Sequence, residues 1–124
     1  MSEPARRVLF ALDRFCLRLQ RGLGLAFQFD DTLAKPSFDC RTAKLPSETA
    51  ICLNRRLARH EASLSKLYFE TITMLPQNQK EEFRAQQRAW LKYRDTCAGS
   101  DVENCLLQRM ADRRNEIIQL KLRQ

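Results

Sequence analysis

Apolar residues recur at helical spacing through most of the chain after residue 46. One face of the region 54–75 carries Leu57, Leu64, Leu67, Tyr68, Thr71, Ile72 and Leu75. Two later stripes carry Phe83, Gln87, Trp90 and Cys97, and then Leu106, Met110, Ile117 and Leu120. Steps of three and four residues are typical of amphipathic helices. We therefore predict an all-α fold, a small antiparallel bundle of three main helices at about 54–75, 79–98 and 101–122, with short helical content at 47–52.

Capping residues indicate where these helices begin and end. Ser47 is the expected N-cap of the short helix, with Glu48 in its first turn, and Asn54 marks a second start. Pro76 is expected to end the preceding helix, and Gly99 to follow the end of the next one as a C′ residue. Asn78 with Glu81 and Ser100 with Glu103 are expected to form capping boxes at the starts of the last two helices. A connection of only residues 99–100 makes the last two helices antiparallel neighbours.

The chain has five cysteines, and four of them form two local pairs. Cys40 and Cys52 are separated by 11 residues, and Cys97 and Cys105 by 7. This pattern fits two short-range disulfides in an oxidising compartment, with buried free thiols in a reducing one as the alternative. Four cysteines allow three pairings, and the tight end of the predicted helix pair favours Cys97–Cys105, stapling the bundle, with Cys40 folding back to Cys52. Cys16 would be free or removed with a leader.

The first 35 residues differ from the rest. Two arginines precede an apolar run, as in a secretory signal, but Asp13, Arg14, Arg18 and Arg21 interrupt it. The segment 1–35 is therefore either an atypical leader or an amphipathic N-terminal helix, with Leu12, Phe15, Leu19 and Leu23 on one side. Residues 6–27 could then contact a membrane surface. Residues 36–124 form the predicted helical domain.

Composition adds partner classes without naming a partner. The 124 residues carry a net charge of +7, which permits nucleic acid, an anionic membrane or an acidic protein. The charges alternate in sign along the helices, which favours solvated faces over a phosphate-binding patch. A basic helical nucleic-acid-binding or membrane-surface-associated protein therefore stands as the alternative function.

The sequence shows no catalytic pattern. It lacks a nucleophile elbow, a phosphate-binding glycine loop and a zinc-protease helix. His60 stands alone on a charged stretch, where a solvated surface histidine is expected. Zinc ligands usually lie about two to four residues apart, and no cysteine or histidine pair has that spacing. We predict no enzyme activity, no cofactor and no metal.

The densest group of chemistry-bearing residues surrounds the only tryptophan. The candidate structural or binding cluster consists of Glu48, Gln87, Arg88, Trp90, Arg94 and Asp95. We predict that Trp90 packs near the bundle axis while Arg94 pairs with an acid such as Glu48. The alternative is an exposed Trp/Arg hot spot for a protein partner, or a functional rim around Arg88 and Lys92.

Three blocks of the sequence resemble the family of small secreted bacterial proteins typified by the lysozyme inhibitor LprI. The blocks are SFDCRTAKLPSETAIC, QQRAWLKYRDTC and the final C-L-x6-R. The residues that fit the family pattern are Phe38, Asp39, Cys40, Ala43, Glu48, Ile51 and Cys52, then Gln87, Arg88, Trp90, Leu91, Arg94, Asp95 and Cys97, and finally Cys105, Leu106 and Arg113. The resemblance covers about residues 37–120.

The resemblance implies a periplasmic or secreted, disulfide-bonded helical domain without catalytic residues. It implies an interaction module whose protein partner is unknown, with lysozyme as the specific candidate. Residues 36–124 contain 16 Lys and Arg against 11 Asp and Glu, however, and common lysozymes are basic. Partners of like charge repel each other unless one presents a local acidic patch. A lysozyme inhibitor of this composition therefore needs such a patch.

Overall fold

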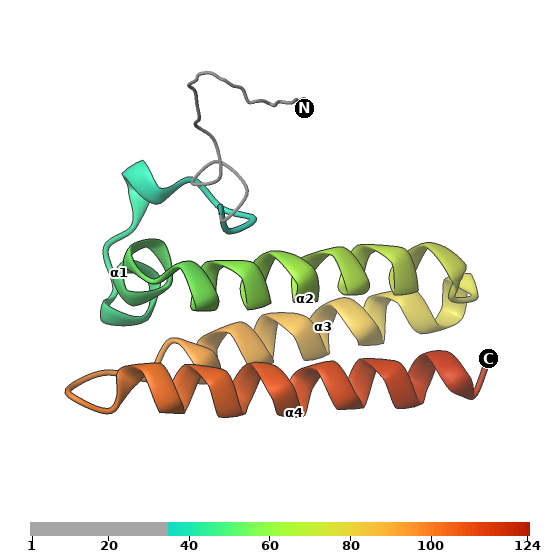
Figure 1. Cartoon of the computed structure of the whole chain (residues 1–124). Helices are drawn as coiled ribbons and strands as arrows, with labels where there is room; N and C mark the ends of the chain where they lie inside the picture. Colours follow the sequence, from blue (N-terminus) through green and yellow to red (C-terminus); the bar gives the residue numbers. More distant parts are fainter. Residues whose placement is uncertain (1–34) are drawn as a thin grey trace, which may run out of the picture. The chain divides into compact units, whose positions relative to one another are not determined.

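The computed structural model describes residues 35–124, and these are entirely helical and irregular, without β-strands. They form a 3-10 turn, η2 (Cys40–Thr42), and four α-helices: α1 (Pro46–Leu53), α2 (Arg55–Met74), α3 (Gln77–Arg94) and α4 (Val102–Leu122). Figure 1 shows α2, α3 and α4 side by side, with α1 at the end where α2 begins. The predicted all-α bundle with disulfides is confirmed for this part of the chain. The expectations for the leader, its amphipathic side and Cys16 fall on residues 1–34, which lie outside the described part.

The core forms where α4 packs chiefly against α2. The predicted apolar stripes of both helices face it, since Leu57 and Leu64 of α2 and Leu106, Met110 and Ile117 of α4 are all buried. Helix α3 contributes much less, because Phe83 and Arg94 are its only buried residues. The bundle is therefore a tight α2–α4 pair with a more polar third helix laid against it.

The start of α1 differs from the prediction. Pro46 is the first helical residue and Leu45 takes the N-cap position, so Ser47 is not the cap. Ser47 is instead fully buried, and its hydroxyl donates a hydrogen bond to Asp95 at 2.8 Å. Proline fits the first turn of a helix because that turn needs no intrahelical N–H donor. The predicted start of α2 is confirmed: Asn54 caps it, accepting from the Leu57 amide at 3.1 Å.

Both ends of α3 were predicted too late in the chain. Pro76, not Asn78, occupies the N-cap position, and the helix ends at Arg94 rather than at residue 98. The chain tightens after Arg94, where the Thr96 and Cys97 amides donate to carbonyls three residues earlier. These tighter bonds end the α-helical ladder.

The connection between α3 and α4 is consequently longer than the predicted two residues. It runs from residue 95 to residue 101, and Cys97 lies within it rather than in a helical turn. Gly99 does adopt the left-handed conformation, with φ of 83°, but as part of this loop and not as the end of the helix. Asp101, not Ser100, occupies the N-cap position of α4.

Two disulfides staple the same end of the bundle. Cys40 is bonded to Cys52 with their Cα atoms 5.9 Å apart, and Cys97 to Cys105 with 5.8 Å. These are the pairs that the sequence proposed. The Ser47–Asp95 hydrogen bond joins the two stapled segments, because Ser47 lies between Cys40 and Cys52 and Asp95 lies two residues before Cys97.

We expect each disulfide to contribute about 2.5–3 kcal/mol to the free energy of unfolding, because each closes a short loop in the unfolded chain. Replacing both Cys97 and Cys105 with serine should lower the free energy of unfolding by this amount, measured from the shift of the urea midpoint. Cys16→Ser is the control. Mapping of the non-reduced protein should recover both pairs. Free thiols at positions 97 and 105 in protein refolded under oxidising conditions would contradict this assignment.

Candidate functional site

The described residues hold no group of His, Cys, Asp and Glu suited to bind a metal ion. His60 is exposed on α2, as expected for a solvated surface histidine. None of the helices in residues 35–124 combines the length and the apolar character needed to cross a bilayer. The chemistry of this part of the chain therefore has to be sought in its buried polar groups, its pockets and its exposed loops.

A buried ion pair lies at the centre of the stapled end. Arg94 is 4% exposed, and both its Nε and its Nη2 lie 2.8 Å from Oδ1 of Asp95. The same carboxylate oxygen accepts the hydrogen bond from Ser47. A buried guanidinium needs such partners, since an unpaired charge in the interior is strongly destabilising. The predicted acid is therefore present, but it is Asp95 and not Glu48.

Glu48 has a different role, at the start of α1. Its Oε1 accepts hydrogen bonds from the backbone amides of Lys44 at 2.9 Å and Leu45 at 3.1 Å. These two bonds, aided by the positive charges of Arg94 and Lys44, lower the pKa of Glu48 below its ordinary value of 4.5. The carboxylate thus satisfies amides that the helix itself leaves without acceptors.

Trp90, which was predicted to pack near the bundle axis, is partly buried. Its ring packs against the edge of the core, and its indole N–H donates to the Arg109 carbonyl at 3.3 Å. The Arg94 guanidinium lies 5.9 Å from the ring centroids of both Trp90 and Phe38. The tryptophan therefore covers the buried arginine while keeping one edge toward the surface.

The remaining two members of the predicted cluster point to other contacts. Gln87 accepts a hydrogen bond from Nε of Arg113 at 2.9 Å, which links α3 to α4. Arg88 is largely exposed and lies 3.5 Å from Glu81. The six residues of the cluster therefore do not form one site. Arg94 contacts both Asp95 and Trp90. Glu48, Gln87 and Arg88 make their hydrogen bonds and ion pairs with residues outside the cluster.

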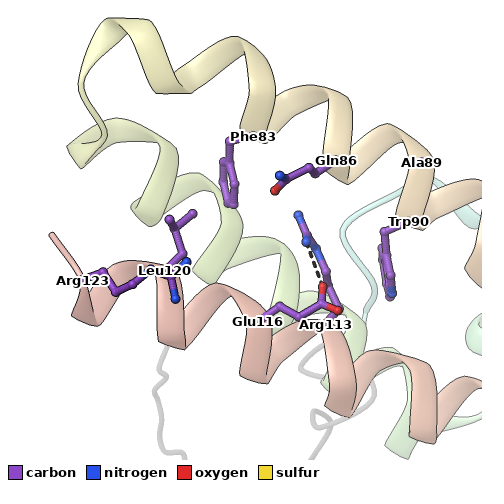
Figure 2. Close-up of a pocket in the computed structure, with 8 residues that line it drawn as sticks. All are labelled: Phe83, Gln86, Ala89, Trp90, Arg113, Glu116, Leu120 and Arg123. Carbon is purple, nitrogen blue, oxygen red and sulfur yellow. Dashed lines mark hydrogen bonds and ion pairs between the residues drawn. The ribbon is translucent and has the colours of Figure 1, made fainter.

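Trp90 also separates two pockets. One, of about 540 Å³, lies between α3 and α4, and Figure 2 shows its lining. The other, of about 290 Å³, lies between α2 and α3, where Ser37 is held by two hydrogen bonds of 2.6 Å to the buried Glu61. The α3–α4 pocket is lined by Phe83, Gln86, Ala89, Trp90, Arg113, Glu116, Leu120 and Arg123.

Arg113 is a buried residue of the α3–α4 pocket that the pattern of apolar residues did not predict. It is 4% exposed, although arginine is normally a surface residue. Its position follows Leu106 and Met110 and precedes Ile117 at steps of three and four, so the helical stripe does include residue 113. The spacing therefore predicts that residue 113 is buried, but an arginine at this position argues against burial.

The loop between α3 and α4 presents the opposite charge to most of the domain. Residues 95–104 contain three acids and no Lys or Arg, and both Asp101 and Glu103 are exposed. Beside the loop, Tyr93 is 56% exposed and the Arg109 guanidinium stacks 3.9 Å from its ring centroid. Arg109 also donates to the Tyr93 carbonyl and to the Thr96 hydroxyl. We call residues 95–104, which comprise the α3–α4 connection and the first three residues of α4, the apex loop.

A family model described as "Lysozyme inhibitor LprI" matches residues 40–117, which is more than half of the chain. The matched span begins at the first stapled cysteine and ends in the buried part of α4, so it includes both disulfides, the buried ion pair and Arg113. No curated protein and no solved structure matches the chain.

The buried ion pair predicts a large stability loss on removal of Asp95. Asp95→Ala should lower the free energy of unfolding by about 3 kcal/mol, because Arg94 would stay buried without its carboxylate. Urea unfolding followed by circular dichroism measures this change. Asp112→Ala, which removes an exposed carboxylate from α4, should change stability by less than about 1 kcal/mol. Equal effects of the two substitutions would contradict the role of the pair.

Glu48 predicts a pH dependence of stability. Because its pKa is lowered in the folded state, its contribution is present at neutral pH and is lost as the pH falls through the folded-state pKa. Glu48→Ala should therefore destabilise by about 1 kcal/mol at pH 7, and the difference from the unmodified protein should shrink below about pH 4.5. Glu70→Ala, on the exposed side of α2, is the control. A difference that stays constant from pH 7 to pH 3 would rule out this assignment.

Proposed function

The chain belongs to the lysozyme inhibitor LprI family, and on that premise we propose that it is a non-enzymatic, exported protein-interaction module that inhibits a lysozyme. The family match over residues 40–117 is the observation that carries the proposal. The two disulfides support export, because such bonds persist in oxidising compartments such as the periplasm or the exterior. The stapled bundle supports a binding role, since a rigid surface loses little conformational entropy on association.

Charge makes the apex loop the favoured face for a basic partner. The domain as a whole is basic, so a cationic lysozyme would be repelled by most of its surface. The apex loop carries the exposed acids Asp101 and Glu103 and contains no Lys or Arg of its own, and Arg109 contacts it at Thr96. Its base is fixed by the Cys97–Cys105 disulfide and by the contacts of Asp95, so the loop is ordered before it meets a partner. The exposed Tyr93 next to it supplies the aromatic contact that interface hot spots favour.

A muramidase assay tests the proposal. Oxidised protein at micromolar excess should slow hydrolysis of cell walls by a lysozyme, and the effect should weaken with increasing salt because charges of opposite sign attract the partners. No change in rate with any of several basic lysozymes would remove lysozyme as the partner.

Charge reversal at two places locates the binding face. The double variant Asp101→Lys/Glu103→Lys should weaken inhibition at least tenfold. The matched control, Glu81→Lys/Glu82→Lys, makes the same change in net charge near the start of α3, at the far end of the bundle (Figure 1). Equal losses from both variants would show that net charge and not the apex loop controls binding.

The alternative functions give different results in the same preparation. A nucleic-acid-binding protein should shift labelled DNA or RNA with an affinity that falls steeply as salt rises. A membrane-surface protein should sediment with anionic vesicles, and deletion of residues 1–35 should abolish this. Positive results in these assays, together with an unchanged muramidase rate, would replace the proposal.

A further inference from the structure

The pocket between α3 and α4 contains a buried hydrogen-bond donor that is not satisfied. Arg113 donates from Nε to Gln87 at 2.9 Å and from Nη1 to Glu116 at 3.0 Å. Its Nη2 is also buried, but it has no hydrogen-bond partner among residues 35–124. A buried N–H without an acceptor destabilises a protein, so native structures rarely retain one without a reason.

The free nitrogen points into the pocket. Figure 2 shows the Arg113 side chain rising from α4 between Phe83 and Trp90 and ending below Gln86. Phe83 lies on one side, with its ring centroid 5.5 Å from the guanidinium carbon, and Trp90 forms the other wall. Leu120 and Ala89 extend the apolar lining. A volume of about 540 Å³ is in the range that small-molecule sites occupy.

The charged groups of the lining favour an anion. The lining contains two cations, Arg113 and Arg123, and one carboxylate, Glu116. Glu116 is itself largely exposed, since 64% of its side chain is accessible, while the Arg113 side chain is 5% accessible. One ion pair therefore leaves the pocket with one positive charge in excess, close to apolar walls where an added negative charge would be weakly screened.

We propose that this pocket binds a small apolar carboxylate, whose oxygen accepts from Arg113 Nη2 and whose hydrocarbon body lies between Phe83, Trp90 and Leu120. The carboxylate supplies the missing acceptor through a charge-assisted hydrogen bond. The body replaces solvent along the aromatic walls. This site is separate from the apex loop and does not depend on the proposed inhibition of lysozyme.

Entry to Nη2 requires one side chain to move. Nη2 is buried, and Figure 2 shows Gln86 above the end of the Arg113 side chain. Gln86 is exposed, and its side chain donates a hydrogen bond to Glu82 of its own helix at 3.2 Å. An exposed side chain with one weak contact changes rotamer readily. Gln86 is therefore the cover of the site, and shortening it should expose the donor without disturbing the core.

The single tryptophan of the chain provides the measurement, because it lines the pocket. Octanoate is the probe, and its addition to the oxidised full chain should change Trp90 fluorescence saturably. Octanol, which has the same body without the charge, and acetate, which has the charge without the body, should each bind at least tenfold more weakly. Equal responses to octanoate and octanol would overturn the carboxylate, and equal responses to octanoate and acetate would overturn the apolar site.

Variants assign the response to this pocket. Gln86→Ala should tighten octanoate binding severalfold, and Arg113→Lys should weaken it at least tenfold because lysine lacks the planar fork. Ala89→Phe fills the pocket from its exposed rim and should abolish binding, which keeps the proposal testable if Arg113→Lys does not fold. Arg114→Ala, on the same helix but in contact with Ser63 of α2, is the control and should bind normally. Unchanged affinity in Ala89→Phe, or no saturable response to octanoate at all, would show that water alone occupies the pocket.

Discussion

The burial of Arg94 is the constraint on which the stapled end depends. A guanidinium inside a protein must find its acceptors locally, and here a single oxygen of Asp95 accepts from Arg94 and from Ser47 together. That oxygen thereby fixes the end of α3 relative to α1. Cys40 and Cys52 flank Ser47 in the chain, and Cys97 follows Asp95 by two residues, so covalent and electrostatic links restrain the same region. The position of the apex loop follows from this restraint, because the loop begins at Asp95 itself.

Much of the fold was predictable because it rests on spacing. The stripes of α2 and α4 are long and regular, and their apolar members are either buried or partly buried against the core, as expected. The helix ends were less predictable, because residues such as Ser47 and Ser100 fit a capping pattern without making the capping bond. The Ser47 hydroxyl instead donates a hydrogen bond to Asp95, which is 48 residues away in the sequence. No local pattern contains that information.

The candidate site was less predictable than the fold. Adjacent residues in a helix do not face one another, so Glu48 was a more natural partner for Arg94 than Asp95. The pair nevertheless forms at the end of α3, where Asp95 is the C-cap residue and not part of a helix that continues to residue 98. The environment of Arg113 was also only partly predictable from the sequence. Its place on the stripe indicates burial, but only the packing of α3 against α4 shows that one of its nitrogens is left without an acceptor.

The disulfides also determine what a protease could do to this protein. Each joins residues of one short segment, with separations of 12 and 8, and neither crosses from α2 to α3. A cut in the connection at Leu75–Pro76 would therefore leave two pieces of the described domain without a covalent bond between them. Many small exported proteins stay linked through their disulfides after such a cut. Here the nicked domain would be held only by non-covalent contacts between the two pieces, chiefly those of α2 with α4 together with the Ser47–Asp95 hydrogen bond. Resistance to proteases therefore has to come from packing rather than from the cross-links.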